Sequence, residues 1–368
     1  MTASYDVVVV GGGPVGAACA RELALEGRRV LVLERGGDIG QGWRAAAGML
    51  APQIESRRDD PLLELGLAAR EHYAPLAAAL AETTGIDIGL WQEGIAAVAA
   101  SDAEGYELKA RVEWQRQQGH LSDWLDAGEV RARWPWLGDT AGALWAAHDG
   151  AIEPEKLVRA LLDDARRVGA VLVEDTVTTI ERVGYRATAV VATGGRYPCG
   201  NVVLAAGAWA RQINGLPRPV SVEPVRGQML AFPWPQGVPR AIVYGKDCYI
   251  VARGDEAIVG STMEFVGFRP EVTAEGLRHI LAAVSALAPV LAGSQPRRRW
   301  AGLRPVTPDG LPIIGPEPRL QGLWYATGHG RNGILLAGLT GLLIRQLMDG
   351  EPTAEDLRPF SPGRFWEW

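Results

Sequence analysis

Apolar runs that end in glycine open the chain and predict a buried parallel sheet. Residues 7–10 are a β-branched run followed directly by glycines, and a second apolar run, residues 30–33, ends at Glu34. Continuous apolar runs of this length are typical of strands that are buried on both faces. Between them, residues 17–25 have a helical pattern that Gly27 ends. The start of the chain therefore predicts a strand, a helix and a second, parallel strand.

The rest of the chain predicts further helices and a sheet of another kind. Helical patterns cover residues 61–83, 108–118, 127–134, 157–169, 277–291 and 332–348. Strand patterns cover residues 91–100, 170–174, 201–207 and 322–328. Between residues 220 and 266, four short β runs, QMLAF, AIVYG, CYIVAR and AIVGST, are spaced as in an antiparallel sheet.

Together these patterns predict an α/β protein. We expect a discontinuous Rossmann-like dinucleotide-binding domain with an inserted α+β substrate domain built on an antiparallel sheet. We assign residues 1–90, 148–215 and 301–368 to the first domain, and residues 91–147 and 216–300 to the second. The length of 368 residues fits two domains at about 100–200 residues each.

Composition and charge narrow the class of protein. Hydrophobic residues make up 47% and charged residues 22% of the chain, which excludes disordered, collagen-like and disulfide-rich classes. A net charge of -6 argues against nucleic acid or an anionic membrane as the main partner. The apolar stretch 334–347 is interrupted by Gly338, Gly341 and Arg345 and is shorter than the roughly 18 apolar residues of a membrane span. It predicts a buried helix.

The cysteines and the N-terminus indicate the compartment. Cys19, Cys199 and Cys248 are widely separated, which predicts neither a disulfide framework nor a metal site. The first residues have no basic segment and no small-residue cleavage site, so they do not have the pattern of a secretory signal. We therefore expect a cytoplasmic protein.

The glycines after the first strand form a phosphate-binding motif. Gly11, Gly13 and Gly16 satisfy GxGxxG directly between the predicted strand and helix. The first glycine allows a tight turn, the second lets backbone N–H groups approach a pyrophosphate, and the third lets the helix pack closely on the strand. Glu34, at the end of the second strand, is placed to accept hydrogen bonds from ribose hydroxyls and would repel the 2′-phosphate of NADP.

The motif by itself does not distinguish NAD from FAD. Two observations favour FAD: the unit begins as early as residue 5, and the remaining chain lacks the regular alternation of a simple dehydrogenase.

Seven motifs in order identify a family. They are GGGPVGAACARELALEGRRVLVLER, AAAGMLAP, DGAIEPEKL, VVLAAGAWA, PVRGQML, GLRPVTPDGLPIIG and GHGRNGILLAG. Over residues 6–345 they resemble the D-amino-acid oxidase (DAO) family of FAD-dependent amine oxidases. AAAGMLAP and GHGRNGILLAG are similar to the glycine oxidase branch, which serves thiamine biosynthesis, whereas GLRPVTPDGLPIIG is shared with sarcosine oxidases and amino-acid dehydrogenases.

The resemblance implies that FAD contacts the glycine motif, the segment beside the flavin ring and the start of the last helix. The implied cofactor residues are Gly11, Gly13, Pro14, Val15, Gly16, Glu34, Arg35, Ala47, Gly48, Met49, Val177, Gly207, His329, Gly330, Arg331, Asn332, Gly333 and Ile334. Residues 41–44 depart from the small hydroxyl residues of glycine oxidases, so no contact is carried over there. Gly302 stands where sarcosine oxidases tether FAD through a cysteine, which implies a non-covalent FAD.

The resemblance also implies substrate contacts at Tyr249, Arg304 and Arg331, with Met263 lining the pocket. Arg304 is expected to clamp the substrate carboxylate with its planar guanidinium, or else to form an internal ion pair. Tyr249 either donates to the same carboxylate or is a core tyrosine, and Arg331 either adjusts the pocket or pairs with an acid. Met263 and Met49 either contact substrate or fill gaps in the packing.

The implied reaction is the oxidative deamination of glycine, sarcosine and D-alanine. A hydride passes to flavin N5, O2 is reduced to H2O2, and the glyoxylate imine is hydrolysed or enters thiazole synthesis. The flavin carries this chemistry, so His329 is interpreted as a loop histidine rather than a base. A D-amino-acid or N-methyl-amino-acid dehydrogenase with another electron acceptor, and a non-catalytic flavin subunit of a complex, are the alternatives. Expected partners are the amino acid, O2, a downstream thiazole synthase and further copies of the chain.

Overall fold

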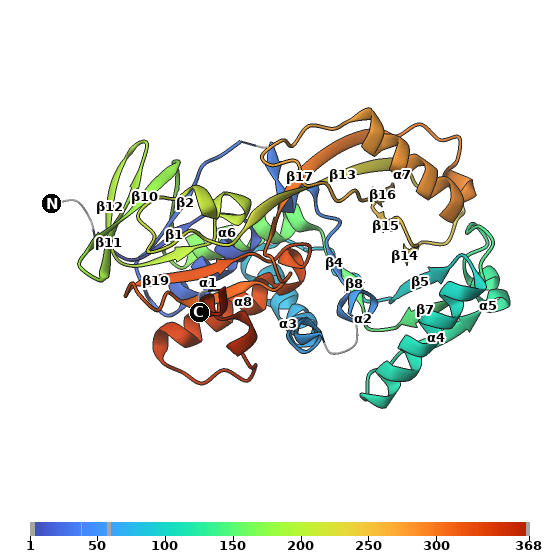
Figure 1. Ribbon diagram of the computed structural model, residues 1–368, viewed down its shortest axis with the longest axis horizontal. Coiled ribbons are helices and arrows are strands. Elements are labelled where there is room, and N and C mark those ends of the chain that lie inside the picture. The colour runs from blue at the N-terminus through green and yellow to red at the C-terminus, as the bar shows by residue number, and fades with distance from the viewer. Residues whose placement is uncertain (1–3, 38, 57–59, 366–368) are drawn as a thin grey trace.

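The computed structural model describes residues 4–37, 39–56 and 60–365, and within these residues two large sheets lie toward opposite ends of an elongated molecule (Figure 1). The first sheet has the order β10-β11-β12-β1-β2-β9, with β19 beside β12 and β18 beside β19. Its strands are β1 (Tyr5–Val10), β2 (Val30–Glu34), β9 (Val171–Glu174), β10 (Val177–Val183), β11 (Arg186–Ala192), β12 (Gly195–Leu204), β18 (Ile313–Pro316) and β19 (Leu323–Thr327). The pairs that join β9, β2, β1, β12 and β19 are parallel.

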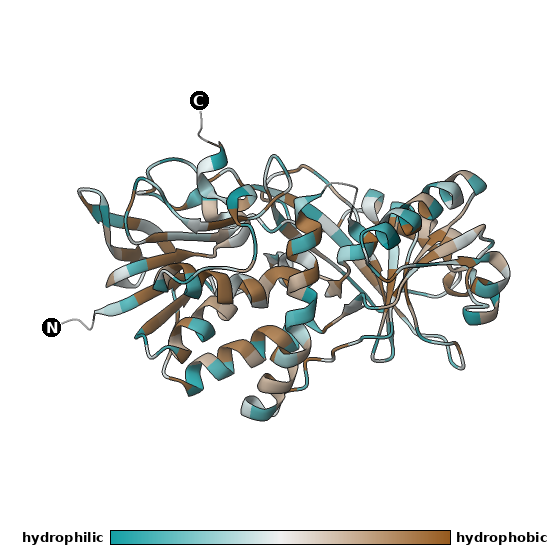
Figure 2. Ribbon diagram, turned by 90° about the horizontal axis from the view of Figure 1, so that it is seen from below, coloured by the Kyte–Doolittle hydropathy of each residue, from teal (hydrophilic) through white to brown (hydrophobic). Residues whose placement is uncertain are grey.

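Helices cover one face of this sheet. They are α1 (Pro14–Leu25), α3 (Pro61–Thr84), α6 (Pro154–Arg167) and α8 (Gly333–Asp349). Their apolar side chains share one core with Val7 and Val9 of β1, whereas Val8 and Val10 face a second cluster that includes residues of β10 and β11. Figure 2 shows apolar ribbon concentrated where these helices meet the sheet. Helix α8 packs tightly on α1. A Cβ atom at Gly341 would lie only 2.6 Å from the Ala18 carbonyl carbon, so the close contact depends on glycine.

The second sheet is mostly antiparallel and has the order β3-β17-β13-β16-β15-β14-β5-β7-β6. Its strands are β3 (Gly40–Gln41), β5 (Ile95–Ala99), β6 (Asp123–Asp126), β7 (Gly142–Ala146), β13 (Glu223–Pro233), β14 (Ile242–Tyr244), β15 (Tyr249–Arg253), β16 (Glu256–Gly260) and β17 (Arg298–Val306). Only its β14–β5 and β17–β3 pairs are parallel among the described residues. Its helices are α4 (Asp102–Gln117), α5 (Ala127–Arg133) and α7 (Ala274–Leu287).

The remaining elements are short. They are η1 (Gly42–Ala45), β4 (Met49–Leu50), α2 (Pro52–Glu55), β8 (Gly150–Ala151), η2 (Gly207–Gln212), η3 (Pro289–Leu291), η4 (Arg358–Phe360) and η5 (Pro362–Phe365). Strands β4 and β8 pair with each other. In the described part of the chain, no helix combines the length and the apolar character that crossing a membrane requires.

The predicted fold class is confirmed, but some element ends differ and some strands were not predicted. Helix α4 begins six residues before the predicted residue 108, at Asp102, because the Ser101 hydroxyl accepts a hydrogen bond from the Glu104 N–H and caps the helix. Helix α7 ends at Leu287 rather than at residue 291, because Pro289 disfavours helix in the residue before it. The antiparallel hairpin β10–β11 was not predicted.

The second sheet takes its strands from several separate segments of the chain. The second sheet takes β5, β6 and β7 from residues 91–147 and β13 to β16 from residues 216–300. Strand β17 runs across residue 301, and β3 joins this sheet from the N-terminal segment. The terminal residues 1–3 and 366–368 lie outside the described residues. We retain the two-domain division as a proposal.

Candidate active site

A cavity of about 660 Å³ lies between the two halves of the molecule. It is lined by residues at the carboxyl ends of the parallel strands β1, β2, β12 and β19, and by residues of β13, β15, β16 and β17. In open parallel sheets, ligands bind at the carboxyl ends of the strands. The volume lies within the range of about 300–1,000 Å³ that is usual for ligand sites.

The glycine motif forms one end of this cavity. Gly11 has a φ of +103°, and a Cβ atom there would lie 2.5 Å from the Ala205 carbonyl oxygen. Gly16 lies outside the cavity, but a Cβ atom there would lie 1.9 Å from the Gly11 carbonyl oxygen, so the close approach of helix and turn requires glycine. Helix α1 begins after Gly13 with no side-chain cap and no acidic residue in its first turn. Its free N–H groups can hold a pyrophosphate.

Glu34 and Arg35 follow the motif at the end of β2, and both line the cavity. The Glu34 carboxylate accepts hydrogen bonds from the Gly12 N–H, at 2.6 Å, and from Gln41 Nε2, at 3.1 Å. Arg35 lies 3.6 Å from the centre of the Trp209 ring, a cation–π contact. The carboxylate is therefore held beside the glycine turn, where the ribose of a dinucleotide is expected.

Part of the segment 41–44, for which no contact was predicted, lines the cavity. Gln41, Gly42 and Trp43 line it. A Cβ atom at Gly13 would lie 3.3 Å from Trp43 Cδ1, so the indole lies beside the glycine motif. The sequence offered no signal for this, because Trp43 departs from the family pattern.

The other predicted cofactor residues gather around the same cavity. Pro14, Val15, Ala47, Gly48, Met49, Val177, Gly207, His329, Gly330, Arg331, Asn332, Gly333 and Ile334 all line it. Gly48 has a φ of +80°, and a Cβ atom there would lie 2.0 Å from the Ile152 carbonyl oxygen. The backbone of this segment is also held from the second sheet, because Arg253 donates to the Ala47 carbonyl oxygen. The cavity therefore combines glycine positions that have no room for a side chain with the uncapped N-terminus of helix α1. This combination fits FAD.

His329 is buried beside the last helix. Its Nε2 atom lies 3.1 Å from the Thr340 hydroxyl. Burial lowers the pKa of His329 to about 3, so the ring is neutral near pH 7 and is a poor proton acceptor. This supports a loop histidine rather than a base.

Arg304 lies at the substrate end of the cavity, across the bare backbone of Gly227. A Cβ atom at Gly227 would lie 2.1 Å from Arg304 Nη1, so the guanidinium lies directly over this glycine and a side chain there would displace it. Arg304 Nη1 donates to the Thr262 carbonyl oxygen at 3.1 Å, and Nη2 donates to the Ser261 hydroxyl at 2.7 Å. No described carboxylate forms an ion pair with Arg304, so the internal ion pair considered above is not formed. Its charge remains available for a substrate carboxylate.

Tyr249 and Met263 line the same end of the cavity. The Tyr249 hydroxyl lies 3.4 Å from the Met229 sulfur, a weak acceptor, and burial raises the pKa of Tyr249. The hydroxyl therefore stays protonated and can donate a hydrogen bond to a stronger acceptor. The Met263 residue is 57% exposed, so it lies at the rim instead of filling a gap in the core.

Arg331 both lines the cavity and pairs with an acid. Its Nε atom lies 2.6 Å from a carboxylate oxygen of Glu55, which also accepts a hydrogen bond from the Tyr244 hydroxyl. The Glu55 charge raises the pKa of Arg331. Glu55 and Tyr244 were not predicted, because no motif marks either of them.

The cysteines and the possible metal ligands form no further site among the described residues. Cys19, Cys199 and Cys248 are buried and form no disulfide. Across the described ranges, no three His, Cys, Asp or Glu side chains are grouped as a metal ion would require.

Comparisons with known proteins identify the family of this chain. The family model for FAD dependent oxidoreductases (DAO) matches residues 6–347. The chain is 38% identical to the glycine oxidase of Geobacillus kaustophilus (strain HTA426), over 98% of this chain and 97% of that protein. A crystal structure of glycine oxidase from Geobacillus kaustophilus superposes with a TM-score of 0.93 at 37% identity, covering 99% of both chains.

A further relative is longer. The chain is 36% identical to the bifunctional protein ThiO/ThiG of Synechocystis sp. (strain ATCC 27184 / PCC 6803 / Kazusa), over 99% of this chain but only 55% of that protein. From the family match and the relatives that it resembles along nearly its full length, we conclude that this chain belongs to the FAD dependent oxidoreductase (DAO) family and uses FAD as its cofactor.

Proposed function

We propose that this chain oxidises glycine, and with it sarcosine and D-alanine, to the corresponding imine. One observation carries the proposal: a single cavity joins the phosphate-binding glycine turn to Arg304, an arginine without an ion-pair partner among the described residues. A small amino acid offers Arg304 a carboxylate within reach of the cofactor. The glycine oxidase relative supports glycine as the preferred substrate.

The protein's own residues bind and orient the substrate in this proposal. Arg304 holds the carboxylate through paired N–H donors, and Tyr249 donates its hydroxyl to the same group. The apolar wall around Met49 limits the water and the volume beside the α-carbon. When bound, FAD would supply the two-electron oxidant for the hydride that leaves this carbon, and O2 would be the final electron acceptor. Overall, glycine, O2 and water give glyoxylate, ammonia and H2O2.

The FAD is expected to be non-covalent, so acid precipitation of the purified yellow protein should release all of the colour into the supernatant. Gly302 has no side chain, and a Cβ atom there would lie 2.6 Å from the Ala45 Cβ atom. Cys248 lines the cavity, but burial raises the pKa of its thiol to about 12, so it stays protonated and unreactive. Absorbance near the flavin band in supernatant and pellet provides the measurement. Yellow colour that stays in a washed pellet would contradict a non-covalent cofactor.

The reaction is tested by peroxide release from the purified protein with a panel of amino acids. Glycine, sarcosine and D-alanine should react with kcat/KM values within about two or three orders of magnitude of each other, because a methylene group changes binding by only about 1–3 kcal/mol. L-alanine should fail, because its methyl group would point where the amine belongs. Efficient oxidation of D-phenylalanine with little activity on glycine would contradict the proposal. Reduction of an artificial acceptor without peroxide would instead indicate a dehydrogenase.

We also propose that the imine or glyoxylate product serves thiazole synthesis. The support is the ThiO/ThiG relative, of which a chain like this one accounts for about half. A homo-oligomer and a cytoplasmic location remain predictions.

A further inference from the structure

We infer that Glu55 is a specificity residue that keeps substrates with a second acidic group out of the cavity by occupying Arg331. This inference rests on the proposed function, in which Arg304 binds the amino-acid carboxylate. It adds a role for an acid that the known motifs do not mark.

Glu55 lies in the cavity beside Arg331. Its side chain is 15% exposed and lines the cavity together with Arg304 and Arg331. One carboxylate oxygen lies 2.6 Å from Arg331 Nε, and the other accepts the hydrogen bond from Tyr244. Of the two arginines at this end of the cavity, Arg331 is therefore neutralised by a carboxylate and Arg304 is not.

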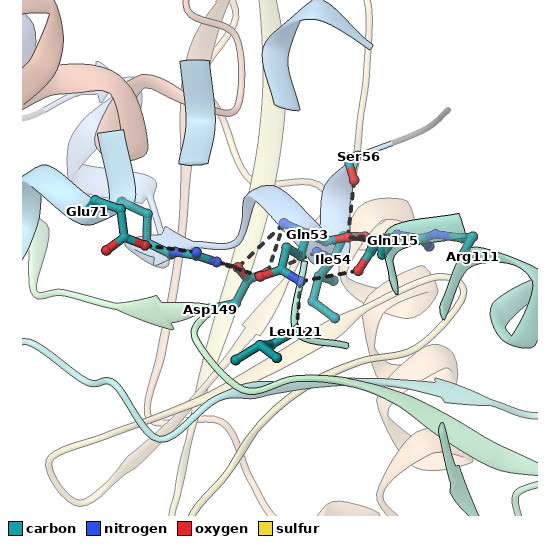
Figure 3. A network of polar contacts seen from close by, with 9 residues as sticks. Gln53, Ile54, Ser56, Glu71, Arg111, Gln115, Leu121 and Asp149 are labelled. Carbon is teal, nitrogen blue, oxygen red and sulfur yellow. Dashed lines mark hydrogen bonds and ion pairs between the residues drawn. The ribbon is translucent and has the colours of Figure 1, made fainter. Parts of the chain in front are cut away.

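A buried polar network fixes the short helix that ends at Glu55 (Figure 3). Asp149, which is fully buried, accepts the N–H groups of Gln53 at 3.1 Å and of Ile54 at 2.9 Å. Arg70 of helix α3 lies 2.8 Å from the Asp149 carboxylate and 2.7 Å from the Gln53 side-chain oxygen. The backbone N–H groups of Gln53 and Ile54 are thus both hydrogen-bonded. Moving this buried segment would break hydrogen bonds that water cannot replace.

The carbonyl side of the same helix is held as well. Gln115 Nε2 donates to the Gln53 carbonyl oxygen at 2.7 Å, and Arg111 donates to the carbonyl oxygens of Gln53, at 3.1 Å, and Ile54, at 2.6 Å. Arg111 and Gln115 belong to helix α4 and lie 58 and 62 positions from Gln53 along the chain. The backbone that carries Glu55 is therefore hydrogen-bonded on both sides, and its carboxylate lies beside Arg331.

This arrangement distinguishes one carboxylate from two. A ligand with a single carboxylate satisfies Arg304 and leaves the Glu55–Arg331 pair intact. The second carboxylate of a dianion would approach Arg331 beside the Glu55 carboxylate, against repulsion between like charges. Removing the Glu55 charge removes the repulsion and frees Arg331 at the same time.

The test compares two ligands that carry no amine to oxidise, methoxyacetate and diglycolate, which differ by the second carboxylate. Calorimetric titration of the FAD-loaded protein gives both Kd values. In the wild type, methoxyacetate should bind and diglycolate should bind more weakly. In Glu55→Gln, which keeps the shape and an acceptor oxygen, the Kd ratio of diglycolate to methoxyacetate should fall by at least about tenfold, the scale expected when a charge a few ångströms away is removed.

Two further variants make the result specific. Asp247→Asn removes another cavity-lining carboxylate that forms no ion pair with Arg331, and should leave the ratio unchanged within about twofold. In Glu55→Gln combined with Arg331→Gln, the gain should disappear, because the freed cation is gone. Arg331→Gln by itself leaves Glu55 uncompensated and should raise the ratio, which tests the inference even if Glu55→Gln does not fold.

Each outcome has one interpretation. An unchanged ratio in Glu55→Gln, or an equal fall in Asp247→Asn, overturns the specificity role while methoxyacetate binding and glycine turnover still support the proposed function. Failure of the wild type to bind methoxyacetate contradicts the carboxylate site at Arg304 and, with it, this inference.

Discussion

Arg304→Ala is expected to lower kcat/KM for glycine by at least about 100-fold, because removing a charge-assisted partner from a desolvated pair costs roughly 2–5 kcal/mol. Arg304 lines the cavity without a carboxylate partner among the described residues, and its guanidinium donates hydrogen bonds to Ser261 and Thr262. Its loss should therefore remove substrate binding with little effect on the fold. Steady-state peroxide release at varied glycine concentration gives the measurement.

Two companion variants separate the clamp from general effects. Arg304→Lys should recover only part of the activity, because a lysine ammonium lacks the planar pair of donors. Arg298→Ala provides the matched control: Arg298 lies in the same strand, β17, but pairs with Glu256 outside the cavity. It should leave glycine turnover near the wild-type value. Near-normal turnover in Arg304→Ala would move the carboxylate site to Arg331.

Gly16→Ala is expected to raise the Kd for FAD by at least about 100-fold, or to prevent stable folding, because overpacking of a tight contact typically costs about 1–3 kcal/mol and here moves backbone at the phosphate site. The added Cβ atom would lie 1.9 Å from the Gly11 carbonyl oxygen and 3.2 Å from the Ala205 Cβ atom. Neither neighbour is the end of a flexible side chain, so the turn and α1 must separate. Quenching of flavin fluorescence during titration of the apoprotein reports FAD affinity, and circular dichroism on heating reports stability.

The matched control for this change is Gly195→Ala. A Cβ atom at Gly195 would meet no heavy atom within 4 Å, and its φ is not in the left-handed region. FAD affinity and the Tm should therefore remain close to the wild type. If Gly16→Ala also binds FAD normally, the close packing of turn and helix is not needed for the cofactor site.

The sequence by itself was sufficient for the parts of the protein that depend on short-range patterns. The strand, glycine turn and helix of residues 5–34 are contiguous, so periodicity and the steric needs of Gly11 and Gly16 were sufficient to predict them. The four β runs between residues 220 and 266 were likewise predicted, and they form β13 to β16. Helix ends were less predictable, because the Ser101 cap and Pro289 act through one or two local contacts that periodicity does not reveal.

The substrate end of the cavity could be predicted in part, through family motifs. Arg304, Tyr249 and Arg331 were identified by resemblance, and all three line the cavity. What the resemblance did not decide was which arginine is free. That depends on Glu55, which lies 276 positions from Arg331 in the chain and meets it only in the folded protein.

The tertiary structure alone decided the position of Glu55. Helix α2 has four residues, too few for any periodic pattern, and it is held by Asp149 and Gln115 from elements more than 60 positions away. Its geometry comes from buried hydrogen bonds between distant segments, whose partners leave no mark on their local sequence. Strands and phosphate turns are determined by neighbouring residues, whereas the charge balance of the cavity is determined by which distant side chains the fold brings together.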